Sequence, residues 1–384
     1  MFPNHESTPK WTNRKLAGRI PELDGIRGLA ILLVLIFHYI VEVASFNVDG
    51  RIRTTILCFA LTWSGVDLFF VLSGFLIGGI LLDAKHADNY YRTFYFRRIS
   101  RIVPLYAVLI ATFIIGAYCV PSASKPLAAM FDTHIPTWSY FFFLQNVFMT
   151  LHRSYGSGWM SVTWSLAVEE HFYLLLPFVV RRLSSKGIAA FAIGMIVVAP
   201  ALRGILAHYA VSGLAMYTLF PCRADALGGG LLVAIACRNR TMWTWLTSHR
   251  RYCYAAFTIF GVGILAWTVV YYNLGYGWMA AFYTSLLVLV VANPGCVERR
   301  VFRSAVLVKL GTVAYAVYLF HPGILRLCHY LCFGAIPIND NWRTAGTTAL
   351  SLAATLLVAG ISWRVLEKPL IQRARLRYRY GTEP

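Results

Sequence analysis

Eight ionisable side chains interrupt the long apolar stretches of this sequence, and they are the first candidates for chemistry. Such side chains are costly in the hydrocarbon core of a membrane, and those found there usually bind a substrate, carry a proton or pair with one another. Histidine is the usual general base near neutral pH, and arginine is suited to phosphate groups. The eight are Arg27, His38, Asp67, Glu169, Glu170, His171, Asp225 and His321.

Arg27 and His38 stand in one apolar stretch, with ten residues between them. Eleven helical steps return to nearly the same face, about 16 Å farther along the axis. We therefore expect Arg27 at the cytoplasmic mouth of a site and His38 near the middle of the bilayer. An anion held by Arg27 could extend a long group to His38, which would act as the base. The alternative is that His38 is a core histidine bonded to a backbone carbonyl.

A second basic group lies in YFRRISRIVPLY (95–106), ahead of another apolar stretch. Arg98 and Arg101 are three residues apart, so a helix places them on one face. Two adjacent guanidinium groups form a clamp for phosphate. The alternative is a positively charged anchor at the membrane surface.

The acidic residues are expected at the opposite mouth. Asp67 lies early in the stretch 64–84, and Glu169 and Glu170 lie in 163–177. Neighbouring residues point about 100° apart on a helix, so at most one of the two glutamates faces a given pocket. The spacing does not say which one. For Asp67 the alternative is an ion pair with a buried arginine such as Arg223.

Two later segments add further candidates. CRADALGGG (222–230) carries Arg223 and Asp225, which form either a salt bridge or a hydroxyl-binding site. AYAVYLFHPG (314–323) carries His321, for which the alternative is a satisfied histidine beside a proline kink. Together the candidates predict a cationic inner mouth, an acidic outer mouth and a histidine between them. This layout suits a reaction between a polyanionic cytoplasmic donor and a hydroxylated acceptor.

The composition indicates that membrane helices position these residues. Of the 384 residues, 58% are hydrophobic and 13% are charged, against about 25% charged in ordinary soluble domains. This excludes a soluble globular enzyme and a disordered chain. Because a spanning helix needs roughly 20 apolar residues, we predict an all-α polytopic membrane protein with about ten crossings. The apolar runs are 26–45, 57–82, 102–120, 164–182, 187–208, 214–236, 252–271, 278–293, 310–333 and 346–366.

One shorter run, 138–150, is predicted to be re-entrant or interfacial. With ten crossings and both termini in the cytoplasm, all but eight of the 35 Lys and Arg residues lie on the cytoplasmic side, as in most membrane proteins. We predict one membrane domain, 21–372, between basic cytoplasmic tails at 1–20 and 373–384. The second tail is expected to lie on the lipid surface.

Other classes of function are disfavoured. The net charge of +19 comes from positions next to membrane helices, so we expect no nucleic-acid binding. The eight Cys residues include no CxxC pair, and no two of the ten His residues lie three or four apart. We therefore expect neither a metal site nor a disulfide framework. The absence of a visible internal repeat weakens a transporter interpretation.

The motifs quoted above, with two more, follow one another along the chain, and through these seven motifs the chain resembles the acyltransferase-three family of integral-membrane O-acyltransferases. The resemblance extends from about residue 20 to residue 372. The motifs are LDGIRGLAILLVLIFH (23–38), GVDLFFVLSGFLIG (65–78), FRRISRIVPLY (96–106), TWSLAVEEHFYLLLP (163–177), RADALGGG (223–230), YAVYLFHP (315–322) and LEKPL (366–370).

The resemblance implies an enzyme of the bacterial cytoplasmic membrane. Members of the family use acyl-CoA, often acetyl-CoA, from the cytoplasm as a co-substrate, with no permanently bound cofactor implied here. They acylate hydroxyls of sugars in surface polysaccharides, peptidoglycan, exported oligosaccharides or glycosylated small molecules. Some members carry a fused C-terminal extracytoplasmic domain, which we do not expect in this chain.

The resemblance also implies roles for single residues. Arg27 and His38 match the family's Arg–ten residues–His motif, Arg98 and Arg101 match its Arg–two residues–Arg motif, and Glu169 matches the glutamate of the Trp-Ser-Leu segment. We expect the arginines to hold the CoA phosphates, His38 to act as base or nucleophile, and Asp67 or Glu169 to orient His38 or bind acceptor hydroxyls. The expected acceptor-binding residues are Glu170, Arg223, Asp225, His321 and Trp164. In YAVYLFHP (315–322), Pro322 directly after His321 departs from the family pattern.

Two rival functions remain at this point. One is acylation of a glycosylated small molecule, such as a macrolide, or of a lipid-linked sugar. The other is a proton-coupled transporter in which the buried His and acidic residues relay protons. A transporter would move its solute without consuming acyl-CoA.

Overall fold

The computed structural model describes residues 20–44, 59–120, 125–132, 134–270, 275–292 and 297–381. Within these ranges the chain is helical, apart from turns, connections and one isolated bridge between Ala44 and Asn339. The long helices are α2 (Pro21–Ile36), α4 (Gly65–Asp83), α5 (Tyr90–Cys119), α9 (Thr163–Arg182), α10 (Ser185–His208), α12 (Phe220–Ala236), α14 (Arg250–Val270), α15 (Gly275–Ala292), α17 (Ala305–Phe333) and α18 (Trp342–Ser362).

Shorter elements extend or connect these helices. A π turn, η1 (Phe37–Val41), continues α2, and a 3-10 turn, η2 (Ala60–Ser64), precedes α4. The others are α6 (Lys125–Met130), α7 (Thr137–Phe141), α8 (Gln145–Leu151), α11 (Gly213–Thr218), α13 (Arg240–Ser248), α16 (Val297–Phe302), the π turn η3 (Trp363–Glu367) and α19 (Lys368–Arg377).

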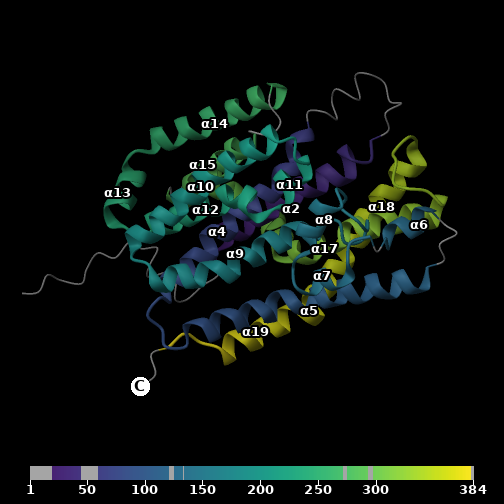
Figure 1. The fold of residues 1–384 in the computed structure, drawn as a ribbon, viewed down its shortest axis with the longest axis horizontal. Coiled ribbons are helices and arrows are strands. Elements are labelled where there is room, and N and C mark those ends of the chain that lie inside the picture. The colour runs from purple at the N-terminus through teal and green to yellow at the C-terminus, as the bar shows by residue number, and fades with distance from the viewer. Residues whose placement is uncertain are drawn as a thin grey trace, which may run out of the picture.

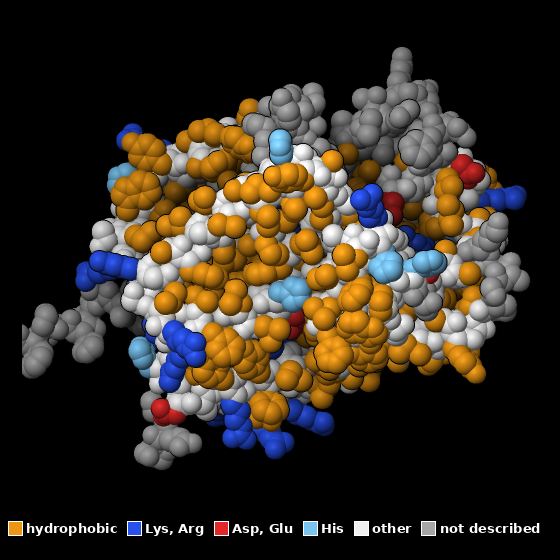
Figure 2. Space-filling model, viewed as in Figure 1, with side chains coloured by type: hydrophobic (Ala, Val, Ile, Leu, Met, Phe, Trp, Pro, Cys, Tyr) orange, Lys and Arg blue, Asp and Glu red, His pale blue; other side chains and the backbone are white. Residues whose placement is uncertain are grey.

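The prediction of an all-α polytopic membrane protein is confirmed. Eight helical segments in the described ranges are long and apolar enough to cross a membrane. The two remaining predicted runs are also helices, α9 with 20 residues and α14 with 21, each about 30 Å long. Apolar side chains cover most of the face in Figure 2, whereas Lys and Arg gather at its left and lower edges. The chain is therefore a multi-pass membrane protein.

The segment predicted not to cross is a pair of short helices. The run 138–150 contains most of α7 and all but the last residue of α8, which are 5 and 7 residues long. A helix of seven residues extends only about 10 Å. Neither helix can cross the bilayer, in agreement with the predicted path.

Two pairs of helices pack backbone to backbone through glycine. A β-carbon at Gly28 of α2 would lie 2.0 Å from the carbonyl oxygen of Leu307, and one at Gly311 of α17 would lie 1.8 Å from that of Asp24. Only glycine permits such contact between helices. The helices α2 and α17 run in the same direction, because Gly28 contacts Leu307 near their starts and His38 contacts His321 farther along. The same holds for α4 and α12, where Gly74 lies at Leu227 and Gly78 at Leu231. In the predicted path of ten crossings, α2 and α17 both cross away from the cytoplasm, and α4 and α12 both cross towards it. The observed helix directions agree with this path.

The C-terminal segment has contacts with α5. Figure 1 shows α19 lying along α5. Beyond α19, Arg97 of α5 donates through Nε to the carbonyl oxygen of Tyr378 at 2.7 Å, and the rings of Phe96 and Tyr378 stack with centroids 4.7 Å apart. Up to Gly381, the last described residue, the segment thus touches α5, while Arg373, Arg375, Arg377 and Arg379 are exposed. The expected position of this tail on the lipid surface stays a prediction.

Candidate active site

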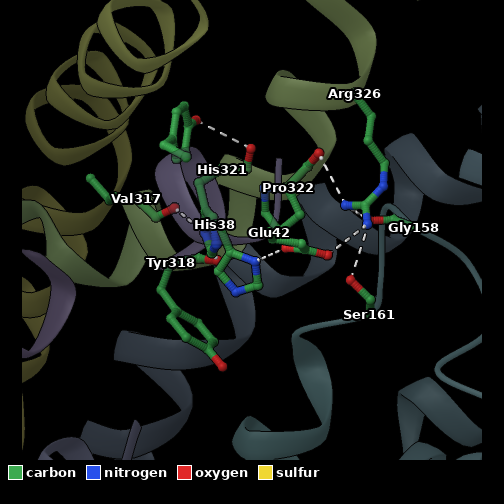
Figure 3. Close-up of polar contacts among 10 residues, drawn as sticks. His38, Glu42, Gly158, Ser161, Val317, Tyr318, His321, Pro322 and Arg326 are labelled. Carbon is green, nitrogen blue, oxygen red and sulfur yellow. Dashed lines mark hydrogen bonds and ion pairs between the residues drawn. The ribbon is translucent and has the colours of Figure 1, made fainter. Parts of the chain in front are cut away.

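The site forms at the end of α2, where the π turn η1 carries His38 (Figure 3). Nδ1 of His38 forms a hydrogen bond with the carboxylate of Glu42, four residues later. An ionised carboxylate only accepts, so Nδ1 donates its proton and Nε2 keeps a lone pair. The side chain of His38 is 23% exposed. His38 lies three residues before the end of the span Pro21–Val41, and its expected depth near the middle of the bilayer stays a prediction.

Glu42 is held by a second charged residue. Arg326 of α17 places Nη2 3.8 Å from Oε1 of Glu42, and its Nη1 donates to the carbonyl oxygens of Gly158 at 3.3 Å and Pro322 at 3.4 Å. Partial burial raises the pKa of Glu42, but the hydrogen bond and charge of His38, together with the charge of Arg326, lower it to about 2. Glu42 is therefore ionised throughout the physiological range.

A second imidazole, that of His321, faces His38 across the contact of α2 and α17, with ring centroids 4.8 Å apart. His321 is fully buried, and its Nδ1–H donates to the carbonyl oxygen of Tyr318 at 2.8 Å. In an uninterrupted helix that carbonyl would accept from the N–H of residue 322, but Pro322 has none. The proline thus frees the carbonyl that fixes the tautomer of His321. Nε2 of His321 keeps its lone pair and has no hydrogen-bond partner.

The three predicted phosphate-binding arginines come together at the start of α2 and in the first half of α5. The charges of Arg27, Arg98 and Arg101 all act on one another. Arg27 also donates through Nη1 to the carboxylate of Asp24 at 2.9 Å, and Arg98 lies over the ring of Tyr173, 5.5 Å from its centroid. This cluster is set at the opposite end of α2 from His38.

The two adjacent glutamates of α9 have different surroundings. The carboxylate of Glu169 accepts hydrogen bonds from the hydroxyls of Ser73 on α4 and Tyr173, the latter at 3.1 Å. The charges of Arg98 and Arg101 also act on it. Oε1 of Glu170 is buried without a hydrogen-bond partner. Glu169 therefore faces the arginine cluster, and the expectation that it lines an acidic outer mouth with Asp67 is wrong.

The other two acidic candidates are neutralised by arginine. Arg223 donates to Asp67, and Nη2 of Arg203 donates to Asp225 at 2.7 Å. All four side chains are at most 4% exposed, and the guanidinium of Arg223 lies 4.3 Å from the ring centroid of Tyr276. These ion pairs join α4 to α12 and α10 to α12. The described residues thus form no acidic outer mouth at Asp67 and Asp225, and for Asp67 the structure bears out the alternative, an ion pair with Arg223.

The remaining candidates lie in packed surroundings. Trp164 is 4% exposed and its ring lies 4.4 Å from that of Tyr217, while Nε2 of His171 donates to the carbonyl oxygen of Phe143 at 3.0 Å. Within the described part of the chain, no hydrogen bond or ring contact joins Trp164 or the two buried ion pairs to His38.

Two residues of the site, Glu42 and Arg326, are not among the residues predicted from the sequence. Glu42 lies four residues after His38, a spacing at which helical side chains meet, so the segment HYIVE could have identified it. No local spacing identifies Arg326, because its contact with Glu42 depends on the packing of α17 against α2. The carboxylate that contacts His38 is thus Glu42, rather than Asp67 or Glu169.

Comparison with known proteins identifies a matching family and several relatives. The family described as an acyltransferase domain matches residues 20–364 of this chain. The chain is 25% identical to the peptidoglycan O-acetyltransferase OatA of Listeria monocytogenes, over 97% of this chain and 59% of OatA. It is 26% identical to the acyltransferase MdmB of Streptomyces mycarofaciens, over 95% of both chains. The chain thus spans about three fifths of OatA and nearly all of MdmB. No solved structure matches this chain.

Proposed function

This protein belongs to the acyltransferase-three family, and we propose that it transfers an acyl group, with acetyl the expected one, from acyl-CoA to a hydroxyl of a sugar in a cell-surface or exported glycan. One observation carries the proposal. His38, oriented by an ionised carboxylate and with a free lone pair, continues the helix that carries Arg27 of the arginine cluster, about 16 Å away along the axis.

The arginine cluster supports binding of the donor. Guanidinium groups bind phosphate oxygens in pairs, and acyl-CoA carries several phosphates at the end opposite to its thioester. Arg27, Arg98 and Arg101 would hold these phosphates. The long pantetheine arm would then extend along α2 and bring the thioester to His38. Acyl-CoA enters as a co-substrate in this scheme, and no permanently bound cofactor takes part.

The proposed reaction begins with proton transfer to Nε2 of His38. The acceptor hydroxyl loses its proton as its oxygen attacks the thioester carbonyl carbon. The tetrahedral intermediate then collapses, the carbon–sulfur bond breaks, and the CoA thiolate takes the proton back from His38. The products are an ester and free CoA, and His38 returns to its starting state. General base catalysis of this kind contributes typically about 10²–10⁴ in rate.

Neighbouring residues would support His38 at separate stages. The carboxylate of Glu42 stabilises the imidazolium that forms while the proton is held, as in other carboxylate–histidine pairs. Nε2 of His321, the second free lone pair, would accept a hydrogen bond from the acceptor and so orient it. The same geometry would also serve an acyl-histidine intermediate on His38. Mass spectrometry of the protein after incubation with acetyl-CoA alone would detect that intermediate.

The orientation in the membrane is part of the proposal. The Lys and Arg asymmetry of the sequence favours cytoplasmic termini, and it puts the arginine cluster on the cytoplasmic side, where acyl-CoA is made. His38, near the opposite end of α2, would then meet an acceptor from the outer side. We place the enzyme in the cytoplasmic membrane of a bacterium.

A glycosylated small molecule is the second candidate acceptor. The chemistry at His38 would be the same for both acceptors. The experiment that tests the function therefore has to survey surface glycans and exported metabolites together.

That experiment compares cells that express the wild type, His38→Ala or His208→Ala, a control at an exposed position of α10. Mass spectrometry of surface glycans and exported metabolites should show one product heavier by one acyl mass in the wild type and in the control. The His38→Ala cells should lack that product although the variant protein is present in their membranes. Full acylation by His38→Ala would refute the proposal.

A further inference from the structure

A cavity of about 390 Å³ lies on the far side of α12 from α4, outside the site at His38. Side chains of α10, α12, α13, α14 and α15 line it, and most of them are apolar or aromatic. In Figure 1, α13 and α14 form an outer edge of the bundle. The cavity lies between this edge and the helices inside it. Its volume is within the range of small-molecule sites, about 300–1,000 Å³.

The polar groups on the wall are nearly all satisfied by the protein. Asp225 is paired with Arg203 at 2.7 Å, so this part of the wall carries no net charge. Ser285 donates to the carbonyl oxygen of Phe282 at 2.7 Å. Among the described lining residues, Oγ1 of Thr284 is the one buried side-chain polar atom without a hydrogen-bond partner. A cavity with such walls suits a hydrocarbon chain more than a polar ligand.

The end of the cavity at α13 is aromatic and basic. Trp245 and Tyr252 belong to its lining, and the ring of His249 stacks on both, with centroid distances of 5.0 and 5.9 Å. The guanidinium of Arg251 lies 4.9 Å from the ring centroid of Tyr252 and donates to its hydroxyl at 3.1 Å. Trp and Tyr are enriched where membrane hydrocarbon meets the headgroups. This end therefore has the character of a headgroup region.

The arginines at this end of the cavity have no acidic residue near them in the sequence. No Asp or Glu occurs between Asp225 and Glu298, whereas Arg240, Arg250 and Arg251 are all exposed. An anionic group from outside the protein would complement this charge. Phosphate on a lipid provides that group at the level of the Trp and Tyr side chains.

We propose that the cavity between α13–α14 and α10–α12–α15 binds one acyl chain of an anionic phospholipid, whose phosphate is held at Arg251. The site is separate from the arginine cluster at α2 and α5. Its occupancy does not depend on acyl transfer, so the two proposals can fail independently.

The test is native mass spectrometry of the purified full-length protein released from nanodiscs of phosphatidylglycerol or of phosphatidylcholine. The wild type should retain one phosphatidylglycerol and should retain phosphatidylcholine more weakly. Ala256→Trp fills the cavity from α14 and should remove the bound lipid. Ile259→Trp, on the same helix with its side chain 60% exposed and outside the lining, should retain it.

A second variant tests the headgroup contact without filling the cavity. Arg251→Gln should weaken retention of phosphatidylglycerol about fivefold, as expected for one basic residue near an anionic lipid, and leave retention of phosphatidylcholine unchanged. Arg92→Gln, at an exposed position of α5, is the matched control. Equal retention of both lipids by the wild type would overturn the proposal, as would undiminished binding by Ala256→Trp. A dimer that Ala256→Trp dissociates would also overturn it, because the groove would then bind a second copy of the chain.

Discussion

Two groups of ionisable residues lie inside this membrane protein, and their partners set them apart. At the end of α2, His38 and His321 each have one nitrogen fixed by the protein, which leaves Nε2 as a free lone pair. At the contact of α4, α10 and α12, by contrast, each carboxylate is paired with an arginine. Asp67 pairs with Arg223, and Asp225 pairs with Arg203.

The difference shows that an ionisable residue in a membrane helix is not by itself a sign of chemistry. A charge paired with an opposite charge in the core holds helices together, and removing one partner leaves an uncompensated charge. A histidine with one nitrogen fixed and the other free is prepared to take a proton. The first group should therefore control activity, and the second should control stability.

The largest expected effect is the loss of catalysis in His38→Gln. Removing the base should lower the rate of CoA release in the presence of the acceptor by about 10²–10⁴. The side chain is partly exposed, so the midpoint of thermal unfolding in detergent should hardly change. His208→Gln should behave as the wild type does. A His38→Gln enzyme with the wild-type rate would remove the distinction between the two groups.

Asp67→Asn should have the opposite profile. It leaves Arg223 buried without its counter-charge, which costs about 3–5 kcal/mol of unfolding free energy, while activity per folded molecule is retained. Denaturant unfolding in micelles measures the first quantity, and rate per folded protein measures the second. The control is Asp83→Asn, whose pair with Arg238 is partly exposed and should cost about 1 kcal/mol or less. Equal costs for the two variants would contradict this assignment.

Arg27→Gln should weaken donor binding. A charged hydrogen bond contributes about 1.5–3 kcal/mol, so KM for acetyl-CoA should rise about 10–100-fold while kcat changes little. Arg343→Gln, at the exposed start of α18, should leave KM as it is. If kcat fell and KM stayed constant, Arg27 would act on the reaction step instead of holding phosphate.

Glu42→Gln should have a smaller effect, because the amide oxygen can still accept from Nδ1 of His38. The loss of charge should lower kcat about tenfold. Glu42 stays ionised down to about pH 2, so it favours the imidazolium at every working pH. Without Glu42, the acid limb of the plot of kcat against pH should move to lower pH.

The free energy of unfolding also depends on Glu42. The stabilising contribution of its ionised carboxylate is present above about pH 4.3 and is lost only as the pH falls towards 2. A shift of the acid limb to higher pH would contradict the pairing.

The smallest expected effect is that of Pro322→Ala. The restored N–H of residue 322 would compete for the carbonyl oxygen of Tyr318, which now accepts from His321. The tautomer of His321 would be less firmly fixed, and kcat should fall by less than in Glu42→Gln. Pro200→Ala, at an interior proline of α10, is the control. An unchanged kcat would show that the tautomer of His321 has no part in the reaction.

The sequence predicts the features that depend on local pattern. Apolar runs predict the helices, and the three-residue spacing predicts that Arg98 and Arg101 share one face of α5, because residues on one helix face keep their relation in any packing. Their gathering with Arg27 follows from the expected position of all three at the cytoplasmic ends of their helices. The prediction of an acidic outer mouth fails because the packing of α4, α10 and α12 decides which residues pair with Asp67 and Asp225. The carboxylate that contacts His38 is likewise missed, although Glu42 follows it at a helical spacing of four residues.

The central claim is that the thioester of acyl-CoA arrives at Nε2 of His38. Bromoacetyl-CoA tests it directly, because its reactive carbon lies next to the thioester carbonyl and alkylates a nearby nucleophile with loss of bromide. After incubation with purified protein and proteolysis, mass spectrometry should find the adduct on the peptide that contains His38. Excess CoA should block it, and His38→Gln should lack it. An adduct at another residue, or one at His38 that excess CoA does not block, would contradict the account.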